Sequence, residues 1–262
     1  MNTLTVKSVK ERLQEVRDES DPFLAQCEKD PRKSVQTLLE QWLKKHAKEK
    51  ALKEQWLNMT AYERLSYKKG FRLIAGVDEA GRGPLAGPVV AGAVILPAQC
   101  EILGLTDSKK LSEKKLEEYY TRITEEAAAI GVGIVHADVI DRINIYEAAR
   151  LAMVKAVNAL AETPDYLLAD AMTLPLDIPQ SSVIKGDAKS VSIAAGACIA
   201  KVTRDRLMAE YAKTYPMYGF EKNKGYGTKE HLEALQAYGP TNIHRKTFAP
   251  VSILLLEKRR KT

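Results

Sequence analysis

Four acidic residues of the chain, Asp78, Glu79, Asp170 and Asp187, follow short apolar runs that have the length of strands. Carboxylates at the end of a buried strand cost free energy unless a cation or a hydrogen-bonding partner compensates their charge. Because oxygen-only ligand sets select hard divalent ions, these residues predict a site for Mg²⁺ or Mn²⁺ rather than Zn²⁺. Two such ions, about 4 Å apart, stabilise the attacking and leaving oxygens in phosphodiester hydrolysis. The acids therefore indicate a metal-dependent nuclease.

Each acid also has a purely structural interpretation. Asp78 and Glu79 could be solvated turn residues, although Gly81, Gly83 and Gly87, which allow close backbone approach, argue against this. Asp170 fits a turn, and Asp187 fits the N-cap of the helix that follows it. Their joint occurrence favours the metal site, because α/β sheets place their sites at one edge. Neighbouring side chains on a strand point to opposite faces of the sheet. Asp78 and Glu79 can therefore both bind the metal only if the strand bends between them or if one of them acts through its backbone.

The elements that must position these acids alternate between strands and helices. Two apolar runs without polar alternation, at 73–77 and 89–96, flank a glycine-rich turn, and such runs are typical of strands covered on both faces. The pattern predicts an α/β fold with a mixed sheet. Further strands are expected at 130–136, 166–169 and 183–184, and helices at 112–123, 145–162, 190–207, 229–237 and 251–258.

Residues 1–70 are predicted to form a polar, α-helical extension of a main domain at 71–262. Thr60 and Glu63 have the spacing of a capping box, which predicts the start of a short helix, and Gly70 suits the end of this helix. The extension either aids nucleic-acid binding or is a solvated helical hairpin whose charges keep it soluble, and the sequence leaves both possibilities open. The charges in question are the lysines Lys44, Lys45, Lys48, Lys50 and Lys53.

The composition favours a polyanionic partner such as nucleic acid. The 262 residues carry a formal net charge of +6, and the sequence pI is near 9.0. Three widely spaced cysteines form neither a disulfide framework nor a metal-spaced pair, which suits a reducing compartment. The charged N-terminus is unlike a signal peptide, and no apolar run reaches membrane-spanning length. We therefore expect a cytoplasmic, monomeric protein with no membrane partner.

The segment 78–88, Asp-Glu-Ala-Gly-Arg-Gly-Pro-Leu-Ala-Gly-Pro, resembles the signature of bacterial ribonuclease HII. Further segments of this chain resemble other sequence blocks of that family, in the same order. The resemblance therefore covers roughly residues 71–250 and does not include the N-terminal segment. The further blocks are 107–111, 185–187, 194–205, 224–228 and 239–248.

The resemblance implies a ribonuclease H-like fold, a mixed five-stranded sheet flanked by helices. It implies hydrolysis of the RNA strand of RNA–DNA hybrids and a nick 5′ of single ribonucleotides embedded in duplex DNA, a step of ribonucleotide excision repair. The products would be a 3′-hydroxyl and a 5′-phosphate. The resemblance implies that the binding partners are RNA–DNA hybrids and duplex DNA that contains ribonucleotides. Matching the motifs residue by residue, two Mn²⁺ or Mg²⁺ ions would be held by Asp78, Glu79, Asp170 and Asp187.

The resemblance also implies how substrate is recognised. Gly81, Arg82 and Gly83 would sense the ribose 2′-hydroxyl largely through their backbone, because this group distinguishes RNA from DNA. Tyr226 would stack on the sugar at the RNA–DNA junction, although by itself it would be taken for a loop tyrosine packed on the core. Three basic residues would contact either the substrate phosphates or the carboxylates of the site: Lys109, Lys185 and Arg204. Without the resemblance they look like ordinary exposed charges. The four histidines lack metal-ligand spacing and are interpreted as structural or as minor nucleic-acid contacts.

Three other interpretations are weaker. The glycine pattern 81–86 fits a dinucleotide-binding motif, but a strand and two prolines follow it where a helix is required. A nucleic-acid-binding protein without catalysis would explain the charge but not the acids. A sister ribonuclease HIII-type hybrid nuclease would share the carboxylates, but it normally carries a β-rich N-terminal domain, whereas residues 1–70 look helical.

Overall fold

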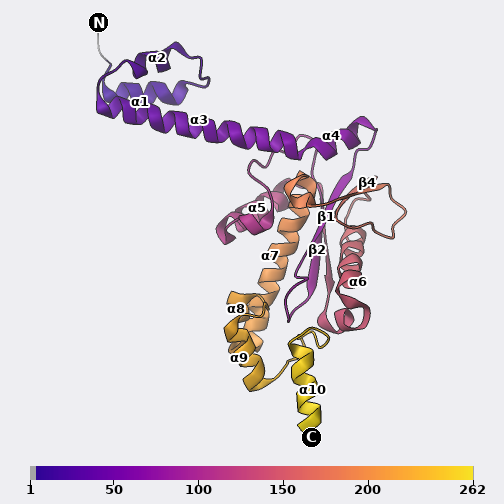
Figure 1. Cartoon of the computed structure of the whole chain (residues 1–262). Coiled ribbons are helices and arrows are strands. Elements are labelled where there is room, and N and C mark those ends of the chain that lie inside the picture. The colour runs from indigo at the N-terminus through magenta and orange to yellow at the C-terminus, as the bar shows by residue number, and fades with distance from the viewer. Residues whose placement is uncertain (1–3, 262) are drawn as a thin grey trace. The chain divides into compact units, whose positions relative to one another are not determined.

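Five strands form one mixed sheet in this computed structural model, which describes residues 4–261 (Figure 1). The order across the sheet is β3-β2-β1-β4-β5. Strand β2 is antiparallel to β1 and β3, whereas β4 is parallel to β1 and β5. The mixed α/β sheet predicted from the sequence is confirmed. The strands are β1 (Ile74–Ala80), β2 (Val89–Ile95), β3 (Ala129–Val135), β4 (Tyr166–Asp170) and β5 (Gln180–Val183).

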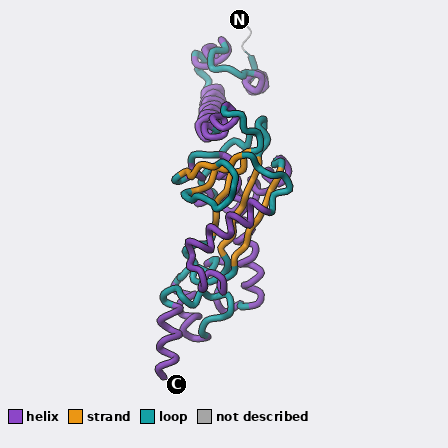
Figure 2. Tube along the Cα trace, turned by 90° about the vertical axis from the view of Figure 1, so that its right-hand side faces the viewer, coloured by secondary structure: helices purple, strands orange, loops and turns teal. Residues whose placement is uncertain are grey.

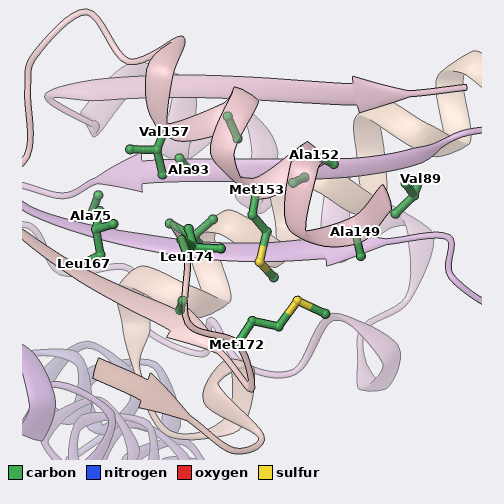
Figure 3. Packing of buried hydrophobic residues seen from close by; sticks show 14 of the residues in the cluster. Ala75, Val89, Ala93, Ala149, Ala152, Met153, Val157, Leu167, Met172 and Leu174 are labelled. Carbon is green, nitrogen blue, oxygen red and sulfur yellow. The ribbon is translucent and has the colours of Figure 1, made fainter. Parts of the chain in front are cut away.

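Long helices cover both faces of the sheet, which explains why its central strands read as continuous apolar runs (Figures 1 and 2). Helix α6 (Ala137–Asn158) packs on one face, where Ala75 and Leu167 lie in one buried cluster with Ala149 and Met153 (Figure 3). Helix α7 (Val191–Thr214) packs on the other face, where Val94 lies in a cluster with Ala195 and Ile199.

Glycines bring both helices into backbone contact with the sheet. A Cβ atom on Gly76 of β1 would lie 1.9 Å from the carbonyl carbon of Ser192 in α7. On the other face, a Cβ atom on Gly131 of β3 would lie 2.0 Å from the carbonyl oxygen of Ala156 in α6. Neither strand position therefore accepts a larger residue without moving a helix.

The expected helix at 145–162 begins earlier, at Ala137, and is interrupted at Asn144, whose φ is 67°. The interruption has a local cause, because Asn144 Oδ1 accepts hydrogen bonds from the backbone N–H groups of Tyr146 and Glu147 and so starts the helix afresh. The remaining helices of this part are α5 (Glu113–Glu126), α8 (Phe220–Asn223), α9 (Lys229–Tyr238) and α10 (Val251–Lys261), with short 3₁₀ turns at Ser108–Lys110, Gly186–Ala188 and Pro216–Tyr218.

The chain divides into two compact units, Met1–Gln55 and Trp56–Thr262. In the first unit, Val9, Phe23 and Val35 share a buried core. Its helices are α1 (Val6–Glu15), α2 (Pro22–Glu28) and the larger part of α3 (Lys33–Met59), and α4 (Ala61–Lys68) belongs to the second unit. The boundary between the compact units therefore lies before residue 70. The functional boundary between the N-terminal extension and the main domain, expected at residue 70, stays a prediction. None of the helices within residues 4–261 has the length and apolar character needed to cross a bilayer.

The expected capping box at Thr60 is wrong. Thr60 is the N-cap of α4, but its hydroxyl donates to the carbonyl oxygens of Trp56 and Leu57 at the end of α3 instead of accepting from α4. Glu63 is turned inward, where its Oε1 accepts hydrogen bonds from the Ser190 hydroxyl at 2.5 Å and from the Ser192 N–H at 3.0 Å. Glu63 thus binds the first turn of α7.

Candidate active site

Asp78 and Asp170 stand on neighbouring parallel strands. Val77 of β1 pairs with Ala169 of β4, so the next residue of each strand is an aspartate. Strand alternation places both aspartates on the α7 face of the sheet. Asp78 is 5% exposed, and its Oδ1 accepts a hydrogen bond from the Glu79 N–H. The register of this strand pair alone brings two acids together that are far apart in the sequence.

Glu79 is expected from strand alternation to point away from Asp78, and the structure shows where its carboxylate goes. Its side chain is 8% exposed, and Oε1 lies 3.3 Å from a guanidinium nitrogen of Arg82. Oε2 is buried with no hydrogen-bond partner. An unpartnered buried carboxylate oxygen is costly, which makes it a candidate ligand for a cation.

Asp187 lies in the 3₁₀ turn Gly186–Ala188 and is 8% exposed. It is not the N-cap of α7, because Ser190 holds that position and its hydroxyl accepts from the Ile193 N–H. The turn is tied to β4, since Asp170 Oδ1 accepts a hydrogen bond of 2.6 Å from the Gly186 N–H. Asp170 therefore both belongs to the acidic group and positions the turn that carries Asp187.

The acids oppose one another electrostatically. Burial, with repulsion from Glu79, Asp170 and Asp187, raises the pKa of Asp78 well above its ordinary value. Burial raises the pKa of Glu79, with repulsion from Asp170 adding to it and Arg82 acting against it. Burial also raises the pKa of Asp187, and the charges of Asp107 and Asp170 add to the effect. The four carboxylates thus lie close enough to disfavour their common ionisation.

The donor set fits hard divalent cations. Its ligand atoms are all carboxylate oxygens, one of them is buried without a partner, and positive charge near the group would relieve the repulsion. Within residues 4–261, no three acidic, histidine or cysteine side chains are already gathered as a ligand set around one point. Bringing the carboxylates onto a common cation would therefore require side-chain movement.

Two buried arginines shape the loop after β1. The Arg245 guanidinium donates to the carbonyl oxygens of Gly81 and Arg82, at 2.5 and 2.7 Å, and also to that of Gly87. The Arg204 guanidinium donates to three carbonyl oxygens, those of Ala86, Pro88 and Lys224. Gly81 has a φ of 92°, and a Cβ atom there would lie 2.0 Å from Arg204 Nε.

The position of Arg204 corrects both expectations from the sequence. It is 1% exposed and its guanidinium is bound to backbone carbonyls, so it is neither a surface charge nor available to phosphate. Arg245, 0% exposed, was missed by sequence reasoning. The only sequence signal for it was its place in the block 239–248, because an isolated arginine carries no pattern that predicts burial.

Tyr226 stands beside the same loop and is 50% exposed, so it is not packed on the core. A Cβ atom on Gly83 would lie 3.5 Å from Tyr226 Cε1. Arg82, in the same loop, has 45% of its side chain accessible. The structure thus brings the residues proposed for ribose recognition together on an open surface.

Lys109 and Lys185 are both exposed. The Lys109 charge acts to lower the pKa of Asp187, so this lysine lies near the acidic group. Lys185 immediately precedes the turn that carries Asp187 and has a left-handed φ of 57°. Sequence reasoning missed Asp107, whose charge helps to raise the pKa of Asp187, although it stands two residues before Lys109.

Comparison with known proteins covers nearly the whole chain. The family model Ribonuclease HII matches residues 75–251, and the model Ribonuclease HII N-terminal domain matches residues 5–67. The second match extends the relationship to the segment that the motifs had left outside. The Ribonuclease HII of Bacillus velezensis is 97% identical over 251 residues, and that of Bacillus subtilis is 80% identical over 251 residues. Each match covers 96% of this chain and 98% of the relative.

Solved structures share the fold. The ribonuclease H2 from Pyrococcus horikoshii OT3 matches with a TM-score of 0.61 and 28% identity, over 72% of this chain and 99% of that one. Bst-RNase HIII in complex with Mn²⁺ matches with a TM-score of 0.55 and 19% identity, over 74% and 73% of the two chains, which is a likeness of fold alone. The expected ribonuclease H-like fold is confirmed, and the chain belongs to the ribonuclease HII family.

Proposed function

We propose that this chain is a cytoplasmic, monomeric endoribonuclease that hydrolyses the RNA strand of RNA–DNA hybrids and nicks duplex DNA 5′ of single embedded ribonucleotides. The product ends are a 3′-hydroxyl and a 5′-phosphate. The observation that carries the proposal is the group of four carboxylates, in which burial and the charge of neighbouring acids raise the pKa values of Asp78, Glu79 and Asp187, and in which one oxygen of Glu79 is buried without a partner. Membership of the ribonuclease HII family supports the substrate class.

The carboxylates of Asp78, Glu79, Asp170 and Asp187 hold two divalent ions, Mn²⁺ or Mg²⁺. When bound, such ions supply charge stabilisation and an activated water for phosphodiester hydrolysis. The chain's own contribution is to hold negatively charged oxygens in a largely buried place. Asp170 contributes twice, because its hydrogen bond to the Gly186 N–H also fixes the turn that carries Asp187.

The loop Gly81–Arg82–Gly83 reads the ribose 2′-hydroxyl. Arg245 holds the carbonyl oxygens of Gly81 and Arg82 in place through one lone pair each, so the amide hydrogens of the loop and the second lone pairs of these oxygens are the backbone groups that serve for recognition. A glycine at position 83 leaves the space beside Tyr226 open to a sugar. Tyr226 stacks on that sugar at the RNA–DNA junction, and Lys109 and Lys185 meet phosphates.

Cleavage of two substrates tests the proposal, a DNA duplex with one ribonucleotide and a continuous RNA–DNA hybrid, each with Mg²⁺, Mn²⁺ or EDTA. We expect a metal-dependent nick 5′ of the lone ribonucleotide that Asp78→Asn abolishes and Tyr226→Ala weakens. Matched controls are Asp138→Asn, at an exposed ion pair with Arg142, and Tyr238→Ala, at a tyrosine that is 63% exposed. Cleavage of the continuous hybrid alone would indicate the HIII-type activity, and binding without any cleavage would indicate a non-catalytic protein.

The N-terminal segment, residues 1–70, aids nucleic-acid binding in this proposal. The lysine run of α3 lies on a helix of the first compact unit, and Trp42 and His46 stack on one another within it. The salt dependence of RNA–DNA hybrid binding tests this role.

A further inference from the structure

Two histidines that the proposed chemistry does not use form a buried pair beside Tyr226. His231 and His244 are 0% and 1% exposed, and their Nε2 atoms lie 3.0 Å apart. His231 Nδ1 lies 2.8 Å from the carbonyl oxygen of Tyr226. At the other end, the Thr241 N–H donates to His244 Nδ1 at 2.9 Å. A continuous chain of hydrogen bonds therefore runs from Thr241 to the backbone of Tyr226.

The partners at the two ends define where each ring carries its hydrogen. A carbonyl oxygen only accepts, so His231 Nδ1 carries a hydrogen and its Nε2 has a free lone pair. A backbone N–H only donates, so His244 Nδ1 has the lone pair and its Nε2 carries the hydrogen. The bond between the rings then runs from His244 Nε2 to His231 Nε2. Both neutral rings are satisfied in this arrangement, in which the Thr241 hydroxyl, 2.9 Å from His244 Nδ1, can also donate to that nitrogen. A second proton on His231 Nε2 would face the hydrogen that His244 Nε2 already carries.

The pair joins the two segments that support the proposed ribose-reading loop. The segment of Tyr226 holds the loop through Gly225, whose carbonyl oxygen accepts from the Leu85 N–H. The segment of His244 holds it through the carbonyl oxygen of Ile243, which accepts from the Gly87 N–H, and through Arg245. The histidine pair is the side-chain connection between these supports and Tyr226.

We propose that His231 and His244 are positioning residues that fix Tyr226 against the loop 81–83 and thereby set how well the chain acts on a lone ribonucleotide. The inference rests on the proposed function of Tyr226. Neither ring touches substrate. Their effect passes through the Tyr226 carbonyl oxygen, which also accepts a hydrogen bond from the Thr228 N–H.

The alternative is that the rings only fill the core beside Tyr218 and Phe220, which pack against both histidines. Two substitutions of His231 separate the alternatives. His231→Leu keeps a side chain of similar volume but loses the hydrogen-bond donor to the Tyr226 carbonyl oxygen. His231→Asn loses more packing volume but retains an amide N–H in place of Nδ1. Positioning predicts that the asparagine variant is the more active, whereas core filling predicts that the leucine variant is.

A double-mutant cycle with Tyr226→Ala is the second test that distinguishes positioning of Tyr226 from core filling. We expect His231→Leu to lower kcat/KM for the lone-ribonucleotide duplex about tenfold in the native background but less than about twofold when Tyr226 is already alanine. His231→Asn should remain within about threefold of the native chain. Equal losses from His231→Leu in both backgrounds, or a leucine variant more active than the asparagine variant, would overturn the proposal.

Nitrogen-15 NMR of the native chain tests the pair without activity and without a variant that has to fold. At neutral pH we expect a hydrogen on His231 Nδ1 and on His244 Nε2, and both rings neutral. The opposite tautomer on either ring, or a charged ring, would overturn the proposal. A native chain that nicks no ribonucleotide substrate would overturn the proposed function and this inference with it, whereas additive losses in an active chain would overturn the inference alone.

Discussion

Asp78 shows for a single residue how a proposed cation ligand costs stability while no cation is bound. Burial and three neighbouring carboxylates raise its pKa, so its charged form is disfavoured in the folded chain. We expect Asp78→Asn to abolish cleavage and, in EDTA, to raise the free energy of unfolding by about 1–3 kcal/mol, because the amide removes a buried charge. Urea unfolding of both chains in EDTA measures the difference.

The control for this prediction is the exposed variant Asp138→Asn, which should leave metal-free stability nearly unchanged. Adding Mn²⁺ should then stabilise the native chain and have a weaker effect on Asp78→Asn. A variant that is less stable than the native chain in EDTA would show that Asp78 serves the fold rather than a cation.

Acid is expected to destabilise the protein through the histidine pair. Burial, with repulsion from His231, lowers the pKa of His244 from its ordinary 6.5 to about 4. Between these values the unfolded chain binds a proton that the folded chain excludes, so the contribution to stability is complete above pH 6.5 and is lost as pH falls toward 4. From His244 alone we expect a loss of about 2 kcal/mol between about pH 7.5 and about pH 5.

Urea titrations of the native chain and of His244→Gln at both pH values check this. The comparison isolates His244 from the acids of the site, whose raised pKa values act in the opposite direction. We expect a smaller loss toward acid in the variant, even though it begins less stable. An identical loss in both chains would contradict the assignment.

The residue types of the site were predictable from the sequence, but the partners of those residues were not. Asp78 and Asp170 were found because an acid at the end of an apolar run is conspicuous. Arg204 and Arg245 were not, because an arginine becomes a buried support only through the carbonyl oxygens that tertiary folding brings to it. Asp107 escaped for a similar reason, since its proximity to Asp187 depends on the fold.

At the scale of elements, the contact between α4 and α7 links the segment before the sheet to the turn of Asp187. Glu63 accepts hydrogen bonds from Ser190 and Ser192 at the start of α7, where a carboxylate also meets the positive end of the helix dipole. We expect Glu63→Ala to lower the free energy of unfolding by about 1–3 kcal/mol, because it leaves buried donors unpaired. The urea midpoint of unfolding measures the loss.

Glu63→Gln is the matched comparison, because the amide oxygen retains the acceptor for Ser190 and Ser192. It should lose less stability than the alanine variant. Hydrogen exchange should then be fastest in the first turn of α7 of Glu63→Ala, and uniform exchange along α7 would sink the idea of a local anchor.

Local patterns predicted the elements well where the pattern itself contains the cause. Ser112 accepts from the Lys115 N–H at the start of α5, and Ser190 does the same for α7, as helix caps should. The predicted box at Thr60 failed because α3 runs to Met59 and its carbonyl oxygens reach the threonine first. The helix expected from Ile145 begins where Asn144 restarts α6, and what the sequence analysis missed is the helical segment from Ala137 that precedes Asn144.

At the scale of the whole molecule, charge connects the N-terminal segment to the proposed substrate. We expect a chain with Lys44, Lys45, Lys48, Lys50 and Lys53 changed to glutamine to bind RNA–DNA hybrid more weakly. The slope of log affinity against log salt should fall by about 0.9 for each phosphate that these lysines neutralise in the native chain. Glutamine preserves helix propensity, so the helix itself should survive. Fluorescence anisotropy across a salt series measures the slope.

The control changes Lys213 and Lys229, two exposed lysines of α7 and α9, to glutamine. This control should leave the slope nearly as it is. A slope that the five substitutions do not change would return the N-terminal segment to the status of a solvated helical hairpin.

The division of the molecule was less visible in the sequence than its sheet. The alternation of strands and helices carries through the second unit and predicts its architecture. The compact units instead part at Gln55 and Trp56, inside one unbroken helix, where no glycine, proline or change of composition marks the place. Domain limits depend on long-range packing, which local patterns do not encode.

The backbone contact of β1 with α7 and of β3 with α6 has a consequence for genetics. Gly76 and Gly131 have no room for even a methyl group, so a library of substitutions scored by ribonuclease activity should reject almost every change at both positions. Such a screen would assign them the same intolerance as Asp78 and Asp170. Under the proposed function, the glycines would report on folding and the aspartates on turnover, and only a parallel screen for protein abundance separates the two.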